Sequence, residues 1–472
     1  MTQNRRRAAT LKHACFIGIL APLLILQTSR GQSARLAPPD EEIRKILADR
    51  IDKYSAGVGA VIGVIDAQGR RVIAYGKRDA SRPELVDGNT VFAIASVSKV
   101  FTSLILADMV ERGEVALADP AEKYLGFPLP EFKGRKITLL DLATHTSGLP
   151  TAGPVNFAGG LSQETREFLS SYKLAREIGT RFEYSNLGVA LLGEALAKRA
   201  QLSYGQLLQT RVVTPLGLRN TSAGSGDSRT VNWATAHDAA LEPLPPESLA
   251  EYGGAGSIQS SVNDLLDLLA AQLGYSPSPL APAMSRMLAV ERSRVPSLVR
   301  FLARDMNIHL AWLESREAGA RVMWHNGALP GYRSFLGFDP DAHVGVVILW
   351  NTDSVGVEDI GFHILNTKVA VLGAKDLYKH KVILLDTAIL ERYTGRYRFP
   401  EQEASVKHVR DHLTLRGDSD GGSPVAFFPE TERDFYSRDG MYEMHFRIDR
   451  QGHVVGFTFR NPNFSKEVRR TD

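Results

Sequence analysis

Cysteine is almost absent from this chain of 472 residues, in which Cys15 is the only example. Cys15 lies in an N-terminal segment that is first basic ("MTQNRRRAATLKH"), then apolar ("ACFIGILAPLLIL") and finally small and polar ("QTSRGQSA"). That order is typical of a secretory signal peptide, and the apolar run is short for a bilayer span. We therefore expect residues 1–31 to be a signal peptide, with an N-terminal membrane anchor as the alternative.

Removal of such a signal leaves a chain without cysteine, which excludes disulfides and thiol catalysis. A cysteine-free exported chain suits an oxidising compartment. We therefore expect a periplasmic or secreted protein.

The chain also lacks a large excess of charge of either sign. The formal net charge is +3, with 23% charged and 43% hydrophobic residues, and no block of like charge is longer than Arg5–Arg7. These values are ordinary for a soluble globular protein with a real core. They give no argument for nucleic acid or an anionic membrane surface as a partner, and the sequence leaves the oligomeric state open.

Two common hydrolase signatures are missing. An α/β-hydrolase needs Gly-x-Ser-x-Gly, and the nearest stretch, "NTSAG" at 220–224, begins with asparagine. None of the twelve histidines belongs to a His-Glu-x-x-His zinc pattern. His408 and His412 are four residues apart, but in a stretch that alternates like a strand, where we expect exposed side chains. No metal or cofactor is expected.

Two β-rich segments lie far apart along the chain. Residues 57–78 and 332–351 each predict a hairpin, whereas helical patterns dominate from about 95 to 320. One of these helices, at 262–273, follows Ser261 with Asp264 three residues later, a variant of the capping box. This order predicts an α/β (α+β) fold, with one antiparallel sheet built from both ends and an inserted helical subdomain. A cleft is expected between the two lobes.

The sequence pattern changes again after about residue 375. Five or more short segments of alternating apolar residues, separated by turns, predict a small all-β barrel or sandwich. The expected domains are a catalytic domain at 40–372, a linker at 373–388 and a C-terminal β-domain at 389–472.

Ser96 and Lys99 form a Ser-x-x-Lys pattern at the start of an apolar helix, in "FAIASVSKVFTSLIL". Their spacing puts both side chains on one helix face, so an amine can take the serine proton. Burial in apolar surroundings would lower the pKa of the lysine. The alternative is a lysine that extends from an amphipathic helix to water. Ser170 and Lys173 repeat the pattern on what we expect to be a polar surface.

Two further motifs follow, and each has a structural alternative. In Tyr184-Ser185-Asn186, the tyrosine hydroxyl can act as a proton shuttle beside the serine, or the serine and asparagine can simply cap the next helix. In "HNGALPGYRSFLGFD", which starts at His325, Asn-Gly can form a hairpin turn. Alternatively, the segment is an edge strand along the cleft, where the N–H groups of Ala328 and Ser96 form an oxyanion hole.

The order of the three motifs is typical of active-site serine penicillin-recognising enzymes. With "LLDLATHTSGLP", "GTRFEYSNLG" and "HNGALPGYRSFLGF", residues 40–370 resemble the class C β-lactamase-related serine hydrolases. That family includes β-lactamases, penicillin-binding D-Ala-D-Ala carboxypeptidases, D-amino-acid peptidases and esterases. The tail resembles the lipocalin-like β-domain of some members.

The resemblance implies that Ser96 is the acylated nucleophile, Lys99 its activating partner and Tyr184 the acid/base for the leaving group. Whether Lys99 or Tyr184 takes the serine proton stays open. The resemblance also implies substrate-binding residues, namely Asn186, His325, Asn326 and Gly327.

This chain departs from class C β-lactamases at the third motif, where they usually carry Lys-Thr-Gly and the lysine helps bind the substrate carboxylate. Here it is His-Asn-Gly, and a histidine is mostly neutral near pH 7 unless it is paired. "FAIAS" also replaces the glutamate and glycine that typically precede the nucleophile. We therefore expect a serine acyl hydrolase for D-amino-acid peptides, peptidoglycan fragments or small esters. The alternatives are a true β-lactamase and a penicillin-binding or sensor module without turnover.

Overall fold

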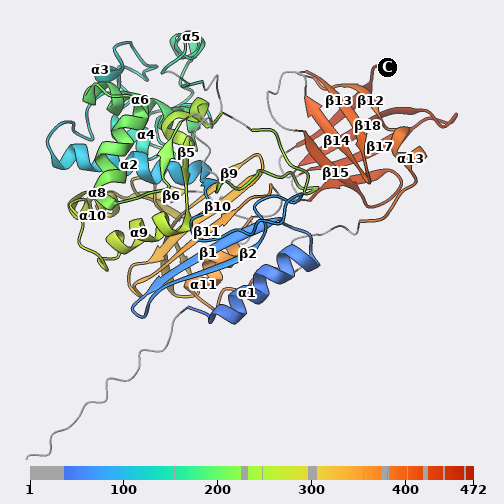
Figure 1. Cartoon of the computed structure of the whole chain (residues 1–472). Helices are drawn as coiled ribbons and strands as arrows, with labels where there is room; N and C mark the ends of the chain where they lie inside the picture. Colours follow the sequence, from blue (N-terminus) through green and yellow to red (C-terminus); the bar gives the residue numbers. More distant parts are fainter. Residues whose placement is uncertain are drawn as a thin grey trace, which may run out of the picture. The chain divides into compact units, whose positions relative to one another are not determined.

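In the computed structural model, an antiparallel sheet of eight strands links distant parts of the chain (Figure 1). Its strand order is β2-β1-β11-β10-β9-β8-β7-β6. Their bounds are β1 Gly59–Asp66, β2 Gly69–Gly76, β6 Arg292–Val295, β7 Met306–Ile308, β8 Leu313–Glu317, β9 Ala320–Leu329, β10 Tyr332–Asp339 and β11 Val344–Trp350. The two hairpins predicted from the sequence pair through β1 and β11, where Val61 lies opposite Leu349. The predicted sheet from both ends is confirmed.

The structure describes residues 37–151, 153, 156–158, 160–224, 232–246, 248–295, 306–353, 356–373, 380, 382–400, 402–417, 424–438, 442–461 and 464–472. They all belong to one unit, Leu36–Asp472. The predicted signal peptide lies outside the described residues. Within them, none of the helices combines the length and apolarity needed to cross a membrane.

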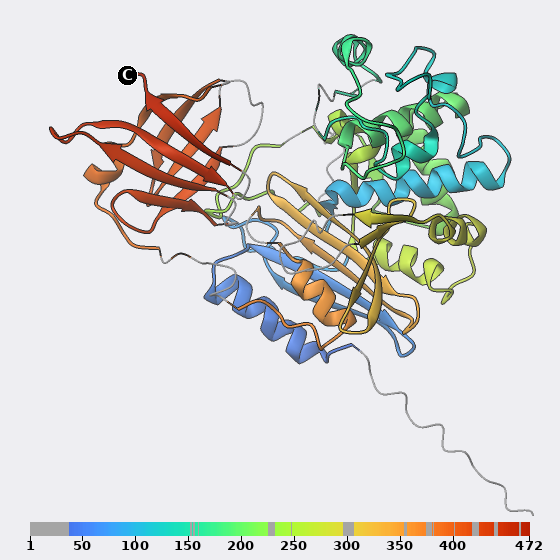
Figure 2. The same ribbon diagram turned by 180° about the vertical axis from the view of Figure 1, so that it is seen from behind.

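Both faces of the sheet are covered by helices. Successive strand residues point to opposite faces, and in β1 and β11 the residues on both faces are buried. On one face, Ile62 and Ile348 pack with apolar residues of α1 and α11. On the other, Val61 and Leu349 pack with α2, α6 and α9 (Figures 1 and 2). The bounds are α1 Asp40–Ala48, α2 Ser98–Glu111, α6 Asn186–Ala200, α9 Val262–Gln272 and α11 Glu358–Leu365.

Short helices and a small sheet complete the helical region. The sheet has the order β3-β5-β4 and connects the chain just before α2 to the chain just before α9. The strands are β3 Phe92–Ala93, β4 Ser222–Ala223 and β5 Ile258–Ser260. The helices are α3 Glu122–Leu125, α4 Leu139–Ala143, α5 Gln163–Ser171, α7 Tyr204–Leu208, α8 Thr214–Leu216 and α10 Ala281–Ala289. The 3₁₀ and π turns are η1 Asp49–Lys53, η2 Ala95–Val97, η3 Gln209–Val213 and η5 Leu249–Ala255.

The predicted cap of α9 is only half formed. The Ser261 side chain accepts a hydrogen bond from the backbone N–H of Asp264, as expected. The Asp264 carboxylate, however, accepts from the N–H of Asn220 and the hydroxyl of Thr221 instead of returning to Ser261. A long-range contact therefore replaces the second half of the capping box.

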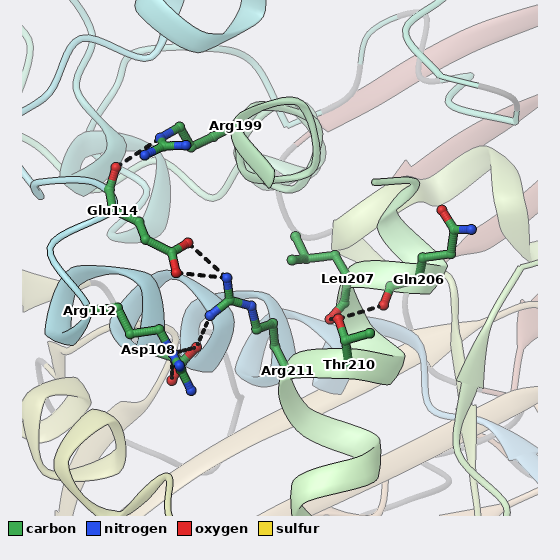
Figure 3. A network of polar contacts seen from close by, with 8 residues as sticks. All are labelled: Asp108, Arg112, Glu114, Arg199, Gln206, Leu207, Thr210 and Arg211. Carbon is green, nitrogen blue, oxygen red and sulfur yellow. Dashed lines mark hydrogen bonds and ion pairs between the residues drawn. The ribbon is translucent and has the colours of Figure 1, made fainter. Parts of the chain in front are cut away.

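A polar network fixes the C-terminal end of α2 (Figure 3). The Arg211 guanidinium on η3 donates to Asp108 at 3.1 Å and to both carboxylate oxygens of Glu114, at 2.7 and 2.9 Å. Arg112 adds two bonds of 2.9 Å to Asp108, whose side chain is only 6% exposed. Arg199 of α6 donates to the Glu114 carbonyl. The network holds α2 against two neighbouring elements.

Arg211→Met is expected to lower the free energy of unfolding by about 1–3 kcal/mol, because it removes charged hydrogen bonds from a nearly buried carboxylate. Chemical denaturation measures this loss. The matched control is Lys45→Met, which breaks an ion pair with Asp49 whose lysine side chain is 75% exposed. That change should cost clearly less, because an exposed ion pair contributes little to stability. Equal losses in the two variants would contradict the importance assigned to the network.

A closed barrel of eight antiparallel strands forms the C-terminal region, which confirms the predicted β-domain fold. The strands are β12 Gly395–Arg398, β13 Glu403–Val409, β14 His412–Gly417, β15 Val425–Pro429, β16 Asp434–Ser437, β17 Glu443–Ile448, β18 Val454–Asn461 and β19 Phe464–Arg470, preceded by α13 Thr387–Glu391. Buried side chains pack together inside it, and the Tyr393 and Phe446 rings stack at 4.1 Å. An eight-stranded barrel is just wide enough for such filling.

His408 and His412 lie in strands, as predicted, but the expectation that both side chains are exposed was wrong. They lie on two different strands, β13 and β14, and His412 is buried with its ring stacked on Phe428 at 5.0 Å. His408 is half-buried and bonded to Glu391. The turn between the strands breaks the alternation that the prediction assumed.

Candidate active site

Ser96 lies in the short turn η2, directly before α2. Its neighbours Ala95 and Val97 are buried, whereas Ser96 is half-exposed. Ala95 has a φ of +49°, in the left-handed region that costs energy for a residue with a Cβ atom. Such strain is common at functional sites, where the surrounding structure holds it in place. Here the turn presents the Ser96 hydroxyl at the end of an otherwise buried helix.

Lys99, one helical turn later, is only 1% exposed. Its Nζ lies 2.9 Å from Ser96 Oγ, 2.8 Å from Asn186 Oδ1 and 2.8 Å from the Ala255 carbonyl oxygen. Burial lowers the pKa of Lys99 from 10.5 to about 7. At neutral pH, Lys99 is therefore a neutral amine in a large fraction of the molecules, as the sequence context predicts.

The partners of Lys99 also decide where the lone pair of that amine points. The Asn186 and Ala255 oxygens can only accept hydrogen bonds, so they take the two amine hydrogens. The lone pair is then directed at Ser96, whose hydroxyl can donate. This arrangement makes Lys99 a competent acceptor for the Ser96 proton.

The second Ser-x-x-Lys pattern provides an internal comparison. Ser170 and Lys173 are both exposed, and the Ser170 hydroxyl donates to the Glu167 carbonyl at 2.8 Å. Sequence spacing is thus the same in the two places, but burial is not. The expectation of a polar surface at Ser170 is confirmed.

Tyr184 lies beside this pair. Lys99 Nζ is 4.9 Å from the centroid of the Tyr184 ring, and the tyrosine hydroxyl has a polar interaction with Ser96. Burial raises the pKa of Tyr184 well above its usual value, and the interaction with Ser96 offsets only part of this rise. The phenol is therefore protonated at neutral pH and can donate a proton.

Asn186 begins α6, and Ser185 is its N-cap, accepting a hydrogen bond from the N–H of Gly188 at 2.9 Å. The capping alternative from the sequence is thus correct for Ser185. Asn186 instead directs its amide oxygen to Lys99. The tripeptide therefore caps α6 through Ser185 and contacts Lys99 through Asn186.

His325, Asn326 and Gly327 lie within β9, and the turn comes later, at 330–331. The hairpin-turn alternative is therefore wrong for Asn326-Gly327. The edge-strand expectation holds only locally, because β9 lies inside the sheet. β8 pairs with residues 320–324, so among the described residues β10 is the only strand paired with 325–329.

Alternation along β9 separates the three side chains of the motif. His325 faces Tyr184, with ring centroids 6.4 Å apart. Gly327 packs against the nucleophile turn, where an added Cβ would lie 2.5 Å from the Ile94 carbonyl oxygen. Asn326 points to the opposite face and donates to Glu358 at 2.5 Å. The Asn326 side chain is thus not brought to Ser96, contrary to the grouping made from the sequence.

His325 is buried and neutral. Its Nδ1 lies 2.6 Å from the Asn326 carbonyl, which can only accept, so Nδ1 carries the hydrogen. Burial first, and then the charge of Lys99, lower the pKa of His325 to about 3. Nε2 is therefore a hydrogen-bond acceptor where a lysine would supply a positive donor.

Ala328 is exposed and follows this segment. Leu329 pairs with Tyr332 across the two-residue turn, and Ala328 with Arg333. In such a hairpin the pair next to the turn exchanges the hydrogen bonds, so the following pair directs its N–H groups away from the partner strand. The ladder therefore points the Ala328 N–H away from β10, as an oxyanion hole requires.

Two residues of this site carried no assignment from the sequence. The Ala255 carbonyl reaches Lys99 because η5 packs closely on the helices. A Cβ on Gly254 would lie 3.0 Å from Thr102 Oγ1 and 3.1 Å from Gly193 Cα. His145 stacks on Tyr184 with ring centroids 4.5 Å apart. It lies in the "THTSGLP" segment, where only the family resemblance could have indicated it.

Comparisons with known proteins agree with this fold and these motifs. A family model described as "Beta-lactamase" matches residues 47–365, and "Domain of unknown function (DUF3471)" matches residues 379–471. The D-alanyl-D-alanine-carboxypeptidase/endopeptidase AmpH of Escherichia coli (strain K12) is 26% identical over 353 residues, covering 69% of this chain and 90% of AmpH. A beta-lactamase of Lysobacter lactamgenus is 25% identical over 368 residues, or 71% and 93%.

Among solved structures, an octameric penicillin-binding protein homologue from Pyrococcus abyssi has a TM-score of 0.62 at 21% identity, over 91% of this chain and 99% of that chain. A beta-lactamase/D-alanine carboxypeptidase from Pseudomonas syringae has a TM-score of 0.58 at 20% identity, over 66% and 94%. These likenesses show the same fold. Since the first family model spans more than half of the sequence, the chain belongs to the beta-lactamase family of serine hydrolases.

Proposed function

We propose that this protein hydrolyses amides or esters through an acyl-enzyme on Ser96. The observation that carries the proposal is the set of three contacts around Lys99, which aims a lone pair at the Ser96 hydroxyl. A serine is a weak nucleophile unless an adjacent base takes its proton. These contacts support Lys99 as that base. Tyr184 is less suited to this role, because its raised pKa keeps the phenol protonated.

In net terms, the proposed acylation moves one proton from Ser96 to the leaving group and replaces the scissile bond with a bond to Ser96 Oγ. Lys99 Nζ takes the proton of Ser96 Oγ while Oγ attacks the carbonyl carbon, and the N–H groups of Ser96 and Ala328 hold the oxyanion. Tyr184 then gives its proton to the leaving oxygen or nitrogen as the bond breaks, and recovers a proton from Lys99. Water reverses these steps on the acyl-enzyme and releases the acid. Asn186 holds Lys99 in place and helps to orient the substrate.

The proposed substrates are D-amino-acid peptides, peptidoglycan fragments or small esters. Support comes from the similarity to a carboxypeptidase/endopeptidase and from the neutral His325 at the third motif. We also propose that the chain is exported, on the basis of the pattern at residues 1–31. The similarity to a beta-lactamase supports β-lactam hydrolysis as the second candidate.

A substrate panel tests this proposal with the full chain. It contains a chromogenic cephalosporin, p-nitrophenyl esters and a D-alanyl anilide, and mass spectrometry locates the acyl group on the peptide that contains Ser96. We expect turnover of the ester or anilide, with slower turnover of the cephalosporin. Cephalosporin turnover alone would reverse the order of the two candidates, and an acyl adduct without turnover would indicate a penicillin-binding or sensor module.

His325→Lys is expected to shift the preference toward substrates that carry a carboxylate. A charge-assisted hydrogen bond to that carboxylate should raise kcat/KM for the cephalosporin relative to an uncharged ester by about 10-fold. The two kcat/KM values, measured side by side, check the prediction. His325→Gln is the control, because it changes the side chain without adding charge. An unchanged ratio in His325→Lys would contradict the assignment of this position to the substrate carboxylate.

A further inference from the structure

His145 contacts Tyr184 and the backbone on both sides of it. The carbonyl oxygen of His145 accepts the N–H of Glu183 at 2.8 Å, and its Nδ1 accepts the N–H of Ser185 at 3.0 Å. Between these two bonds, its ring stacks on the Tyr184 ring at 4.5 Å with an interplanar angle of 28°. One residue therefore fixes both the main chain around Tyr184 and the plane of its ring.

The loop that carries His145 is itself bound along the whole segment that carries Tyr184. Gly179 N–H donates to the Thr146 carbonyl at 2.8 Å, and the Ser185 hydroxyl donates to the Pro150 carbonyl at 2.7 Å. His145 has a φ of +56° and is 1% exposed. A left-handed conformation in a buried histidine persists only where its surroundings determine it.

The hydrogen bonds also fix the protonation of the His145 ring. A backbone N–H can only donate, so Nδ1 is the acceptor and Nε2 carries the single ring hydrogen. Burial first, and then the charge of Lys99, hold the pKa of His145 well below its usual value. The bond to Ser185 is therefore kept across the neutral pH range.

We propose that His145 is a positioning residue that holds the Tyr184 hydroxyl at the leaving group of the substrate. This inference rests on the proposed function, in which Tyr184 protonates that group. A proton donor must lie within hydrogen-bond reach of its target, and a displacement of about 1 Å can cost about 100-fold in rate. The fixed ring plane and the two flanking backbone bonds limit such a displacement.

The test compares two esters of the same acyl group, a p-nitrophenyl ester and a methyl ester, with purified full-length protein. The p-nitrophenolate ion leaves without a proton, whereas methoxide needs one. His145→Ala is expected to lower kcat/KM for the methyl ester by about 100-fold and for the p-nitrophenyl ester by only about 5-fold. A merely structural role would lower both by the same factor, because both depend on the folded fraction.

A second variant and a double variant complete the experiment. His145→Asn keeps an acceptor oxygen close to the position of Nδ1 and tolerates a positive φ, so it should recover part of the lost methyl-ester activity even if His145→Ala unfolds. Tyr184→Phe combined with His145→Ala should be no worse on the methyl ester than Tyr184→Phe alone, because His145 acts through Tyr184.

Equal losses on both esters, or independent losses in the double variant, would overturn the role of His145. A Tyr184→Phe variant with full methyl-ester activity would instead overturn the proposed role of Tyr184, and the inference with it.

Discussion

Ser96→Ala is expected to abolish hydrolysis of every substrate in the panel, with kcat falling by about 10⁴-fold or more. The acyl-enzyme cannot form without the Oγ atom, and the lone pair of Lys99 is left without a donor to deprotonate. Steady-state rates and the mass of the intact protein after incubation with substrate check this result. Activity equal to the wild type would rule out the acyl-enzyme mechanism.

The matched control is Ser170→Ala, which removes the hydroxyl from the second Ser-x-x-Lys pattern. That serine is exposed, and within the described part of the chain its hydroxyl bonds only to a main-chain carbonyl of its own helix, so the variant should keep full activity. Ser96→Ala should also remain folded. Its side chain is half-exposed, and the amine of Lys99 keeps its bonds to Asn186 and Ala255. A loss of activity in Ser96→Ala therefore reports chemistry and not unfolding.

The local pattern of the sequence was sufficient for the sheet and for the nucleophile helix. The segments 57–78 and 332–351 each consist of two β-rich runs joined by a turn, and both form hairpins as predicted. The burial of Lys99 also follows from local sequence, because "IASVSKVFTSLIL" offers the lysine few polar neighbours. In these cases neighbouring residues alone determine the structure.

Alternation along a strand could have separated Asn326 from His325 and Gly327 before the structure was known. Once 325–327 is taken as strand, every second side chain must point to the other face. The prediction instead treated the three residues as one motif. The contact between Asn326 and Glu358 shows where the middle side chain goes.

Other parts of the site could not be predicted from local sequence. Lys99 bonds to a main-chain carbonyl at Ala255, and a carbonyl leaves no trace in the residue type. His145 depends on the pairing of its loop with residues 179–186, which brings distant segments together. The same holds for Asp264, whose carboxylate binds Asn220 instead of completing its own cap. Each of these contacts is set by tertiary packing.

Lys99→Met is expected to lower kcat/KM by about 10³-fold or more, because it removes the base while the nucleophile remains. In the wild type, the pKa of about 7 for Lys99 should appear as the acidic limb of the pH profile of kcat/KM. Activity then rises as the pH increases through 7, since the neutral amine is the active form. Measuring kcat/KM from pH 5 to 9 checks the limb. A profile without an inflection near this pH would contradict the assignment of Lys99 as the base.

The same substitution makes a separate prediction for stability. The unfolded chain binds the Lys99 proton up to pH 10.5, whereas the folded chain releases it near pH 7, so the unfolded state carries more protons between these values. Wild-type stability therefore rises with pH in this window, and the full free-energy penalty of the buried lysine is present below it.

From pH 7 to 9, the wild type should gain about 2 kcal/mol relative to Lys99→Met in chemical denaturation. Lys173→Met, at an exposed lysine, is the control for the replacement of a lysine by methionine as such. A difference between wild type and Lys99→Met that is independent of pH would mean that the amine stays charged in the folded protein, and Lys99 could then not accept the Ser96 proton.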